Sequence, residues 1–201
     1  MPRITAERFQ LRRGSIVAAA RSVFARKGFA QASISDIAEV AGTSDGLIYR
    51  YFKSKRDLLL EVLREFYEGL IRDTEKAIAD EGGFEAKFAV LVLGHLRAYA
   101  DDTDLCRLFI AEVRNFDDYV GSTSQNFNRR YTSILLRIIA SGVAEQAVSP
   151  QIDPRLVRDM LFGGIEHVAW RHISSGAQFD VAGKAQQISA ILIGGLKGCD
   201  L

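Results

Sequence analysis

The residues best placed for chemistry follow a glycine turn near the N-terminus and open a short expected helix. The N-terminal end of such a helix can enter the major groove of DNA and present side chains to base edges. An arginine there can hydrogen-bond guanine, a leucine can contact a thymine methyl group, and a glycine lets the backbone approach closely. The candidate base contacts are Ser44, Asp45, Gly46, Leu47 and Arg50.

Three neighbouring residues suit phosphate groups instead of bases. These are Ser33, Tyr49 and Lys55, and the first and last stand beside expected helix N-termini, which attract anions. Among the candidate base contacts, Asp45 differs from the others because it would bring a negative charge to the DNA. It can either accept a hydrogen bond from cytosine N4 or cap its own helix, and the sequence leaves both roles open.

The elements that must position these residues are two short helices with a turn at Gly42. Ser33 and Asp36 have the spacing of a capping box that opens the first helix, and Ser44 can cap the second. The apolar residues recur at helical spacing and predict a small shared core. They are Ile34, Ile37, Ala38, Ala41, Ile48 and Phe52. This pattern predicts a helix-turn-helix.

Helical spacing of apolar residues continues along the whole chain, and no segment shows the sustained alternation of a half-buried strand. The predicted fold is all-α with about nine helices. The first is expected from about Ala6 to Lys27 with Gly28 ending it, and the fourth extends to about Asp80. We expect a three-helix DNA-binding domain over residues 1–56 and a larger helical bundle over residues 57–201.

The charge distribution supports this division. The net charge is +1, but residues 1–56 carry 11 Lys and Arg against 4 Asp and Glu, whereas the remainder carries 15 against 21. A basic N-terminal part suits phosphate binding, although charge alone would equally suit an anionic membrane surface.

Other classes of protein receive little support. No apolar run approaches the roughly 18 residues of a membrane span, and no signal-peptide core follows the first residues, so we expect a cytoplasmic protein that does not bind membranes. Cys106 and Cys199 lack metal-ligand spacing and are expected to pack. His167 and His172 are five residues apart, on different sides of a helix, so we expect no metal site.

Enzyme motifs are also missing from the sequence. It contains no glycine-rich phosphate loop, no HExxH and no nucleophile elbow. We therefore expect neither catalytic residues nor a cofactor.

The N-terminal pattern resembles the TetR family of transcription regulators, almost without gaps over residues 14–58. The matching positions are residues 19–29, Asp36-Ile37-Ala38, Ala41-Gly42, Ser44, Gly46, Ile48-Tyr49, Tyr51-Phe52 and Ser54-Lys55. The resemblance implies a homodimer on operator DNA, with two C-terminal helices pairing across a twofold axis. The expected dimer contacts are Val157, Leu161, Gly164, Ile165, Val168, Ile188, Ile191, Leu192 and Gly195. The alternative for these apolar stripes is the core of a single protomer.

The resemblance also implies that the bundle binds a small effector. The candidate pocket residues are apolar or aromatic with a few polar partners. They are Phe66, Phe88, Leu91, Val92, His95, Tyr99, Phe109, Arg114, Phe127, Tyr131, Ile134, Leu135 and Trp170. Each has core packing as its alternative, and His95 in particular is expected to be a satisfied core histidine.

Three C-terminal segments are similar to the fatty-acyl-CoA-responsive branch of the family: residues 105–115, 152–158 and 160–166. That similarity implies an acyl tunnel with arginines for the CoA phosphates. The candidates are Arg97, Arg107, Arg114, Arg129 and Arg130.

The expected function is a repressor that a hydrophobic molecule releases from a palindromic operator. The leading candidate for this effector is a fatty acyl-CoA or a fatty acid. The alternatives are a regulator sensing another aromatic or lipophilic compound, such as an efflux-linked drug sensor, and then a helical adaptor or enzyme.

Overall fold

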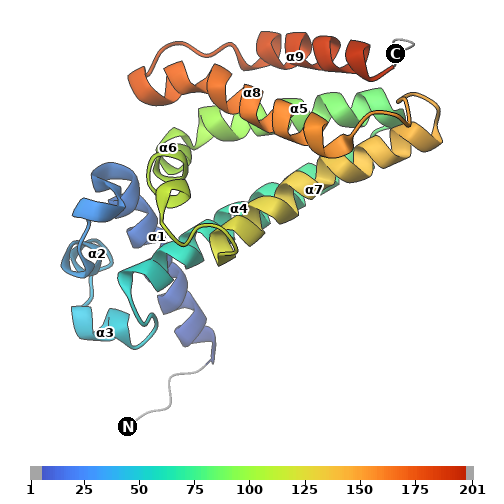
Figure 1. Ribbon diagram of the computed structural model, residues 1–201. Coiled ribbons are helices and arrows are strands. Elements are labelled where there is room, and N and C mark those ends of the chain that lie inside the picture. Colours follow the sequence, from blue (N-terminus) through green and yellow to red (C-terminus); the bar gives the residue numbers. More distant parts are fainter. Residues whose placement is uncertain (1–5, 198–201) are drawn as a thin grey trace. The chain divides into compact units, whose positions relative to one another are not determined.

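The computed structural model describes residues 6–197, so Cys199 lies outside the described residues. Within that range the chain forms nine α-helices, one short 3-10 helix and no strand (Figure 1). The elements are α1 (Ala6–Gln31), α2 (Ile34–Val40), α3 (Asp45–Tyr49), α4 (Lys55–Ala79), α5 (Gly83–Asp101), α6 (Thr103–Ala111), η1 (Val113–Asn115), α7 (Thr123–Ala144), α8 (Pro154–Ser175) and α9 (Val181–Leu196). The all-α prediction is confirmed.

The chain divides into two compact units. The N-terminal unit contains residues up to 66 together with residues 107–125, and the bundle unit contains residues 67–106 and those from 126 onward. The sequence analysis predicted one boundary after residue 56, with residues 57–201 forming the second domain. In the structure the first boundary falls inside α4, and the segment 107–125 packs with the N-terminal unit.

The core of the N-terminal unit comes from the predicted faces of its first helices. On α1, Ile16, Ala20, Val23 and Phe24 are buried, and α1 packs on α2, which packs on α3. The kink in α1 lies at Gly28, whose φ of 76° is a conformation that L side chains rarely adopt. The helix predicted to end at Gly28 therefore continues only as a kinked turn to Gln31.

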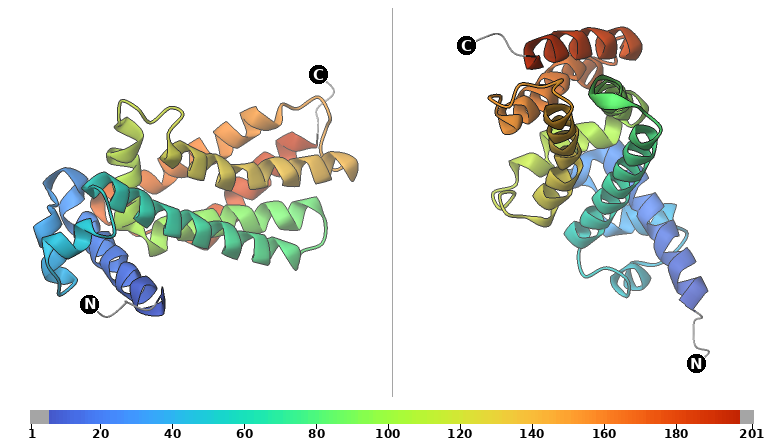
Figure 2. Two further views of the ribbon diagram at one scale, coloured as in Figure 1. Left: turned by 90° about the horizontal axis from the view of Figure 1, so that it is seen from below. Right: turned by 90° about the vertical axis from the view of Figure 1, so that its right-hand side faces the viewer.

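The bundle unit is organised around α5. Figures 1 and 2 show α8 and α9 packed along it. Its buried face includes Phe88, Leu91 and Leu96, which are fully enclosed. On α7, a Cβ at Gly142 would lie 2.6 Å from the Phe84 ring, so only glycine permits this approach of α7 to the start of α5.

Within residues 6–197 no helix is long and apolar enough to cross a membrane. In the same range there is no cluster of three or more histidine, cysteine, aspartate or glutamate residues that could hold a metal ion. Cys106 is buried, in agreement with the packing role expected for it.

Candidate nucleic-acid interface and effector site

The two short helices of the helix-turn-helix have the predicted caps. The Ser33 hydroxyl accepts from the backbone N–H of Asp36, whose carboxylate accepts from the backbone N–H of Ser33. At α3, the Ser44 hydroxyl accepts from the backbone N–H of Leu47 at 3.3 Å. A serine hydroxyl that accepts can still donate. Both serines are exposed, so each retains a donor for a phosphate or base.

Around α3, the exposed residues are those the sequence selected for DNA. Tyr49 is 55% exposed, Arg50 is exposed, and a Cβ built at Gly46 would meet no atom within 4 Å. Ile48 is fully buried on the opposite side. The Asp45 carboxylate accepts a hydrogen bond from the Ser35 hydroxyl at 2.6 Å. This contact joins α2 to α3 and gives Asp45 a structural partner that neither expected role included.

Lys55, which was expected to contact a phosphate group, binds backbone carbonyl groups of its own chain. Its ammonium group donates to the carbonyl oxygens of Phe29 at 2.7 Å, Ala32 at 2.8 Å and Ala30 at 3.3 Å. It also lies 4.5 Å from the centre of the Phe29 ring. An ammonium has three N–H donors, and all three have partners here. A phosphate contact would require Lys55 to give up at least one carbonyl at the end of α1.

A groove of about 480 Å³ lies between α1 and the helix-turn-helix, and two arginines missed by the sequence analysis line it. Arg8 and Arg12 are one helical turn apart on α1 and both are exposed. Leu47 and Tyr51 form the opposite side. The i, i+4 spacing of the arginines was the available signal, because it puts two cations on one face of a helix.

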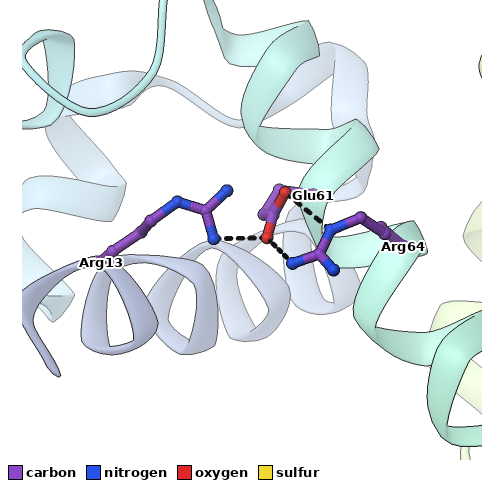
Figure 3. Close-up of polar contacts among 3 residues, drawn as sticks. All are labelled: Arg13, Glu61 and Arg64. Atoms are coloured by element: carbon purple, nitrogen blue, oxygen red, sulfur yellow. Dashed lines mark hydrogen bonds and ion pairs between the residues drawn. The ribbon is translucent and has the colours of Figure 1, made fainter. Parts of the chain in front are cut away.

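A partly buried ion-pair group joins α1 to α4 within the N-terminal unit (Figure 3). The Glu61 carboxylate accepts from Arg13 at 2.5 Å and from two nitrogens of Arg64. These two guanidinium groups, Arg64 foremost, hold the pKa of Glu61 at about 2, below its ordinary value of 4.5, against the opposing effect of burial. The carboxylate therefore stays charged and ties the two helices together.

Lowering the pKa of Glu61 from 4.5 to about 2 corresponds to about 3.5 kcal/mol, at about 1.4 kcal/mol per pKa unit. Because solvent screens the partly exposed guanidinium groups, we expect Glu61→Gln to destabilise the N-terminal unit by on the order of 2 kcal/mol at pH 7. Because the folded-state pKa is lowered, this stabilisation is complete above pH 4.5 and is lost as the pH falls through about 2. Urea unfolding at pH 7 and pH 3 should show the difference between the two proteins shrinking. Glu65→Gln is the control. Burial raises the pKa of Glu65, so the charge of Glu65 does not stabilise the folded state and its removal should not lower the stability. A difference that does not change with pH would contradict the assignment.

The segment 107–125 contacts the N-terminal unit at the kink of α1. The Glu112 carboxylate accepts from the backbone N–H groups of Phe29 at 2.8 Å and Ala30 at 3.2 Å. A Cβ at Gly28 would lie 2.6 Å from that carboxylate. A second link is the ion pair of Arg56 with Asp118, which lowers the pKa of the aspartate. These contacts explain why residues 107–125 belong to the N-terminal unit.

In the bundle unit, most of the expected effector residues are buried. Those that are buried are Phe88, Leu91, Val92, Tyr99, Phe127, Tyr131, Ile134 and Leu135. His95 is half-buried among them. Three further candidates, Phe66, Phe109 and Arg114, belong to the N-terminal unit. The predicted effector residues therefore include buried aromatic and aliphatic side chains of the bundle unit and three residues of the N-terminal unit.

A groove of about 290 Å³ opens on the bundle unit between α4, α5 and α7. Ile78, Ile134 and Ile138 form its apolar part, and Lys87 and Arg137 stand among its polar lining. Arg137 forms an ion pair with Glu75 at 2.5 Å. Of the residues predicted for an effector, the groove includes Ile134.

Comparison with known proteins accounts for almost the whole chain. Residues 16–62 match the family of bacterial regulatory proteins named tetR, and residues 63–195 match the C-terminal region of YsiA-like proteins. The chain belongs to the TetR family. It is a DNA-binding transcription regulator and not an enzyme, and the resemblance found at residues 14–58 is confirmed.

Several relatives of this TetR regulator are similar over nearly their full length. The fatty acid metabolism regulator protein of Bacillus subtilis is 28% identical over 181 residues, which are 90% of this chain and 93% of the relative. The repressor KstR2 of Mycolicibacterium smegmatis is 28% identical, over 92% and 90%. The structure of B. subtilis FadR in complex with stearoyl-CoA superposes with a TM-score of 0.84 at 27% identity, covering 90% and 98%.

The expected dimer residues of the TetR regulator fall into two groups. Val157, Leu161 and Ile165 are buried inside the protomer, which favours the core alternative for these three side chains. The large apolar side chains that stay exposed on α8 and α9 include two that were predicted for the dimer, Val168 and Ile191. The exposed apolar face of α8 and α9 is defined by Leu156, Met160, Val168, Trp170 and Ile191.

Glycines and Trp170 complete this exposed face. A Cβ added at Gly164 or Gly195, both predicted for the dimer, would meet open space, whereas Ile188 and Leu192 are half-buried. Trp170 was expected in the effector pocket, but it is 42% exposed. It is therefore placed on the α8 and α9 face instead of in the interior.

Proposed function

We propose that this TetR regulator represses transcription as a homodimer on a palindromic operator and is released by a hydrophobic effector, with a fatty acyl-CoA as the first candidate. The observation that carries the effector class is the relative that binds stearoyl-CoA, since it matches 98% of its length to this chain with a TM-score of 0.84. The name of the B. subtilis relative, a fatty acid metabolism regulator, supports the same class.

The operator contacts divide into base reading and phosphate binding. Ser44, Gly46, Leu47 and Arg50 are proposed to face base edges, and Ser33 and Tyr49 are proposed to donate to phosphates. Arg8 and Arg12 add a pair of cations beside Leu47 and Tyr51, in the position to bind the sugar-phosphate backbone next to the recognition helix.

The effector is proposed to bind in the bundle unit. Its interior is aromatic and aliphatic, which suits an acyl chain. Arg97, Arg129 and Arg130 are exposed on the same unit and can approach phosphate groups of CoA, and Lys87 stands at the groove. Binding releases the operator only if the effector prefers the arrangement of the dimer that does not fit DNA.

The dimer is proposed to form through the exposed apolar face of α8 and α9. Large exposed apolar patches mark interaction sites, and the glycines on both helices allow backbones to approach closely. An isologous contact of this kind gives the twofold symmetry that a palindromic operator requires.

Replacing Arg50 and Arg12 should separate base reading from phosphate binding. Arg50→Ala is expected to cost about 1–3 kcal/mol on the operator and to relax preference at one base pair. Arg12→Ala is expected to weaken binding to all sequences alike and to reduce the slope of log K against log salt by about 1. Fluorescence anisotropy with operator and scrambled duplexes over a salt series measures both. Unchanged affinity in both variants would contradict the interface.

The effector class is tested by native mass spectrometry of the gently purified protein and by operator competition. A bound acyl-CoA or fatty acid that releases the duplex supports the proposal. If acyl-CoA leaves operator binding unchanged, the regulator senses another lipophilic compound. Binding to a protein partner or a vesicle, without any sequence-dependent binding to DNA, would favour the adaptor alternative.

A further inference from the structure

Three rings from three helices meet inside the bundle unit. His95 of α5 lies 4.8 Å from Phe162 of α8 and 5.4 Å from Tyr131 of α7, measured between ring centres. Tyr131 and Phe162 are 5.7 Å apart. The residues come from positions 95, 131 and 162, so only the fold brings them together. Two of the three rings carry polar atoms.

Those polar atoms are buried without partners. Nδ1 of His95 and Oη of Tyr131 are both enclosed, and neither forms a hydrogen bond with any described residue. The hydroxyl of Thr74 is the nearby polar group on α4, but no hydrogen bond of acceptable geometry joins it to Tyr131. His95 is therefore not the satisfied core histidine that the sequence predicted. Buried polar atoms are nearly always paired, so two unpaired atoms in one cluster require an explanation.

Both groups are uncharged at physiological pH. Desolvation by burial lowers the pKa of His95 to about 3, so the imidazole is neutral. Burial also raises the pKa of the Tyr131 phenol above its ordinary value, and the Thr74 hydroxyl only partly opposes this shift. Tyr131 is thus an O–H donor, and Nδ1 of His95 donates or accepts depending on the tautomer.

We propose that His95 and Tyr131 form a recognition site for a neutral oxygen, a carbonyl or hydroxyl group, on the lipophilic part of the effector. This inference rests on the proposed effector function and specifies the chemistry that the site selects. A carbonyl oxygen can accept from both groups, and a hydroxyl can accept from Tyr131 while donating to Nδ1. The ligand would then supply the missing hydrogen bonds.

The site favours a neutral oxygen over a carboxylate. A carboxylate placed here would lose its hydration among Phe162, Tyr99 and Tyr131 and would face a neutral imidazole instead of a cation. A ligand without oxygen would leave both polar atoms unpaired. Sites built to hydrogen-bond a ligand discriminate strongly against analogues lacking the group, because their own buried polar atoms then remain unsatisfied.

The test compares three probes that differ only near the thioester. They are hexadecanoyl-CoA, 3-hydroxyhexadecanoyl-CoA and S-hexadecyl-CoA, a thioether without the carbonyl. Calorimetry on the full-length dimer gives the dissociation constants of the wild-type protein, Tyr131→Phe and His95→Phe. Tyr67→Phe is the control, because Tyr67 is a buried neighbour of Tyr131, 6.5 Å away between ring centres, outside the proposed pair.

We expect the wild-type protein to bind at least one oxygen-bearing probe about tenfold more tightly than the thioether. Tyr131→Phe and His95→Phe should each reduce this preference about fivefold and leave thioether binding unchanged, as the loss of one hydrogen bond predicts. Tyr67→Phe should keep the preference. A preference for the 3-hydroxy probe over hexadecanoyl-CoA assigns the site to a chain hydroxyl, and equal binding of the two assigns it to the thioester carbonyl.

Two outcomes would overturn the inference in different ways. Equal binding of all three probes by the wild-type protein, or an unchanged preference in both variants, refutes the neutral-oxygen site and leaves the acyl-CoA function intact. Failure of the wild-type protein to bind any probe refutes the acyl-CoA proposal and the inference together. Unliganded operator binding, measured in parallel, shows whether each variant retains its fold.

Discussion

Ile191→Glu should lower operator affinity by about 100-fold or more while each protomer remains folded. Ile191 is 73% exposed on α9, so a charge there costs the isolated protomer little. In the proposed dimer the same side chain lies in an apolar interface, where an unpaired carboxylate is strongly unfavourable. A monomer engages one half-site only and loses the affinity gain of two linked sites, which reaches 10²–10⁴.

Sedimentation velocity and operator anisotropy on the same sample measure this effect. Met160→Glu, 57% exposed on α8, should behave in the same way. Gln186→Glu is the matched control, since it adds the same charge to an exposed position on another side of α9. If Ile191→Glu stays dimeric and binds the operator normally, the dimer forms through a different surface.

Lys55→Met should destabilise the N-terminal unit by about 2–4 kcal/mol, because it removes a cation that donates to three carbonyl groups. Hydrogen bonds to charged groups contribute about 1.5–3 kcal/mol each, and water can replace part of them at the half-buried site. Methionine retains most of the apolar stem, so the effect reports on the ammonium group. Operator binding should fall through loss of folded protein.

Thermal unfolding separates this structural role from a phosphate contact. A phosphate contact predicts an unchanged melting temperature and a salt slope reduced by about 1, whereas the carbonyl contacts predict a lower melting temperature. Lys53→Met is the control, because Lys53 is exposed and lies two residues before Lys55 in the sequence. A fully stable Lys55→Met protein with weakened DNA binding would restore the phosphate assignment.

Local patterns predicted the helix-turn-helix well. The capping box of Ser33 and Asp36 and the inward positions of Ile48 and Phe52 depend on residues a few positions apart, which is the range over which helix geometry acts. For the same reason the sequence identified Tyr49 and Arg50 as outward-facing. Arg8 and Arg12 were missed because their relevance depends on the approach of α1 to Leu47 and Tyr51.

The C-terminal helices show where such patterns stop being sufficient. On α8, Leu156 and Met160 are exposed, whereas the residues that follow them, Val157 and Leu161, are buried. Apolar residues therefore form two stripes on one helix. Helical spacing reveals two stripes but not which one faces the protomer core, because that depends on where α5 lies. The sequence analysis chose the stripe that α5 and its neighbours bury.

The sequence alone determined the all-α class, the helix-turn-helix and the family, since these depend on short-range periodicity, helix caps and residue types. Only the tertiary structure decided which groups from distant positions meet. Lys55 lies against carbonyls 23 to 26 residues earlier in the chain, Glu112 contacts the backbone of Phe29, and His95 meets Tyr131. Contacts of this kind are set by the packing of whole helices, and no local pattern in the chain encodes them.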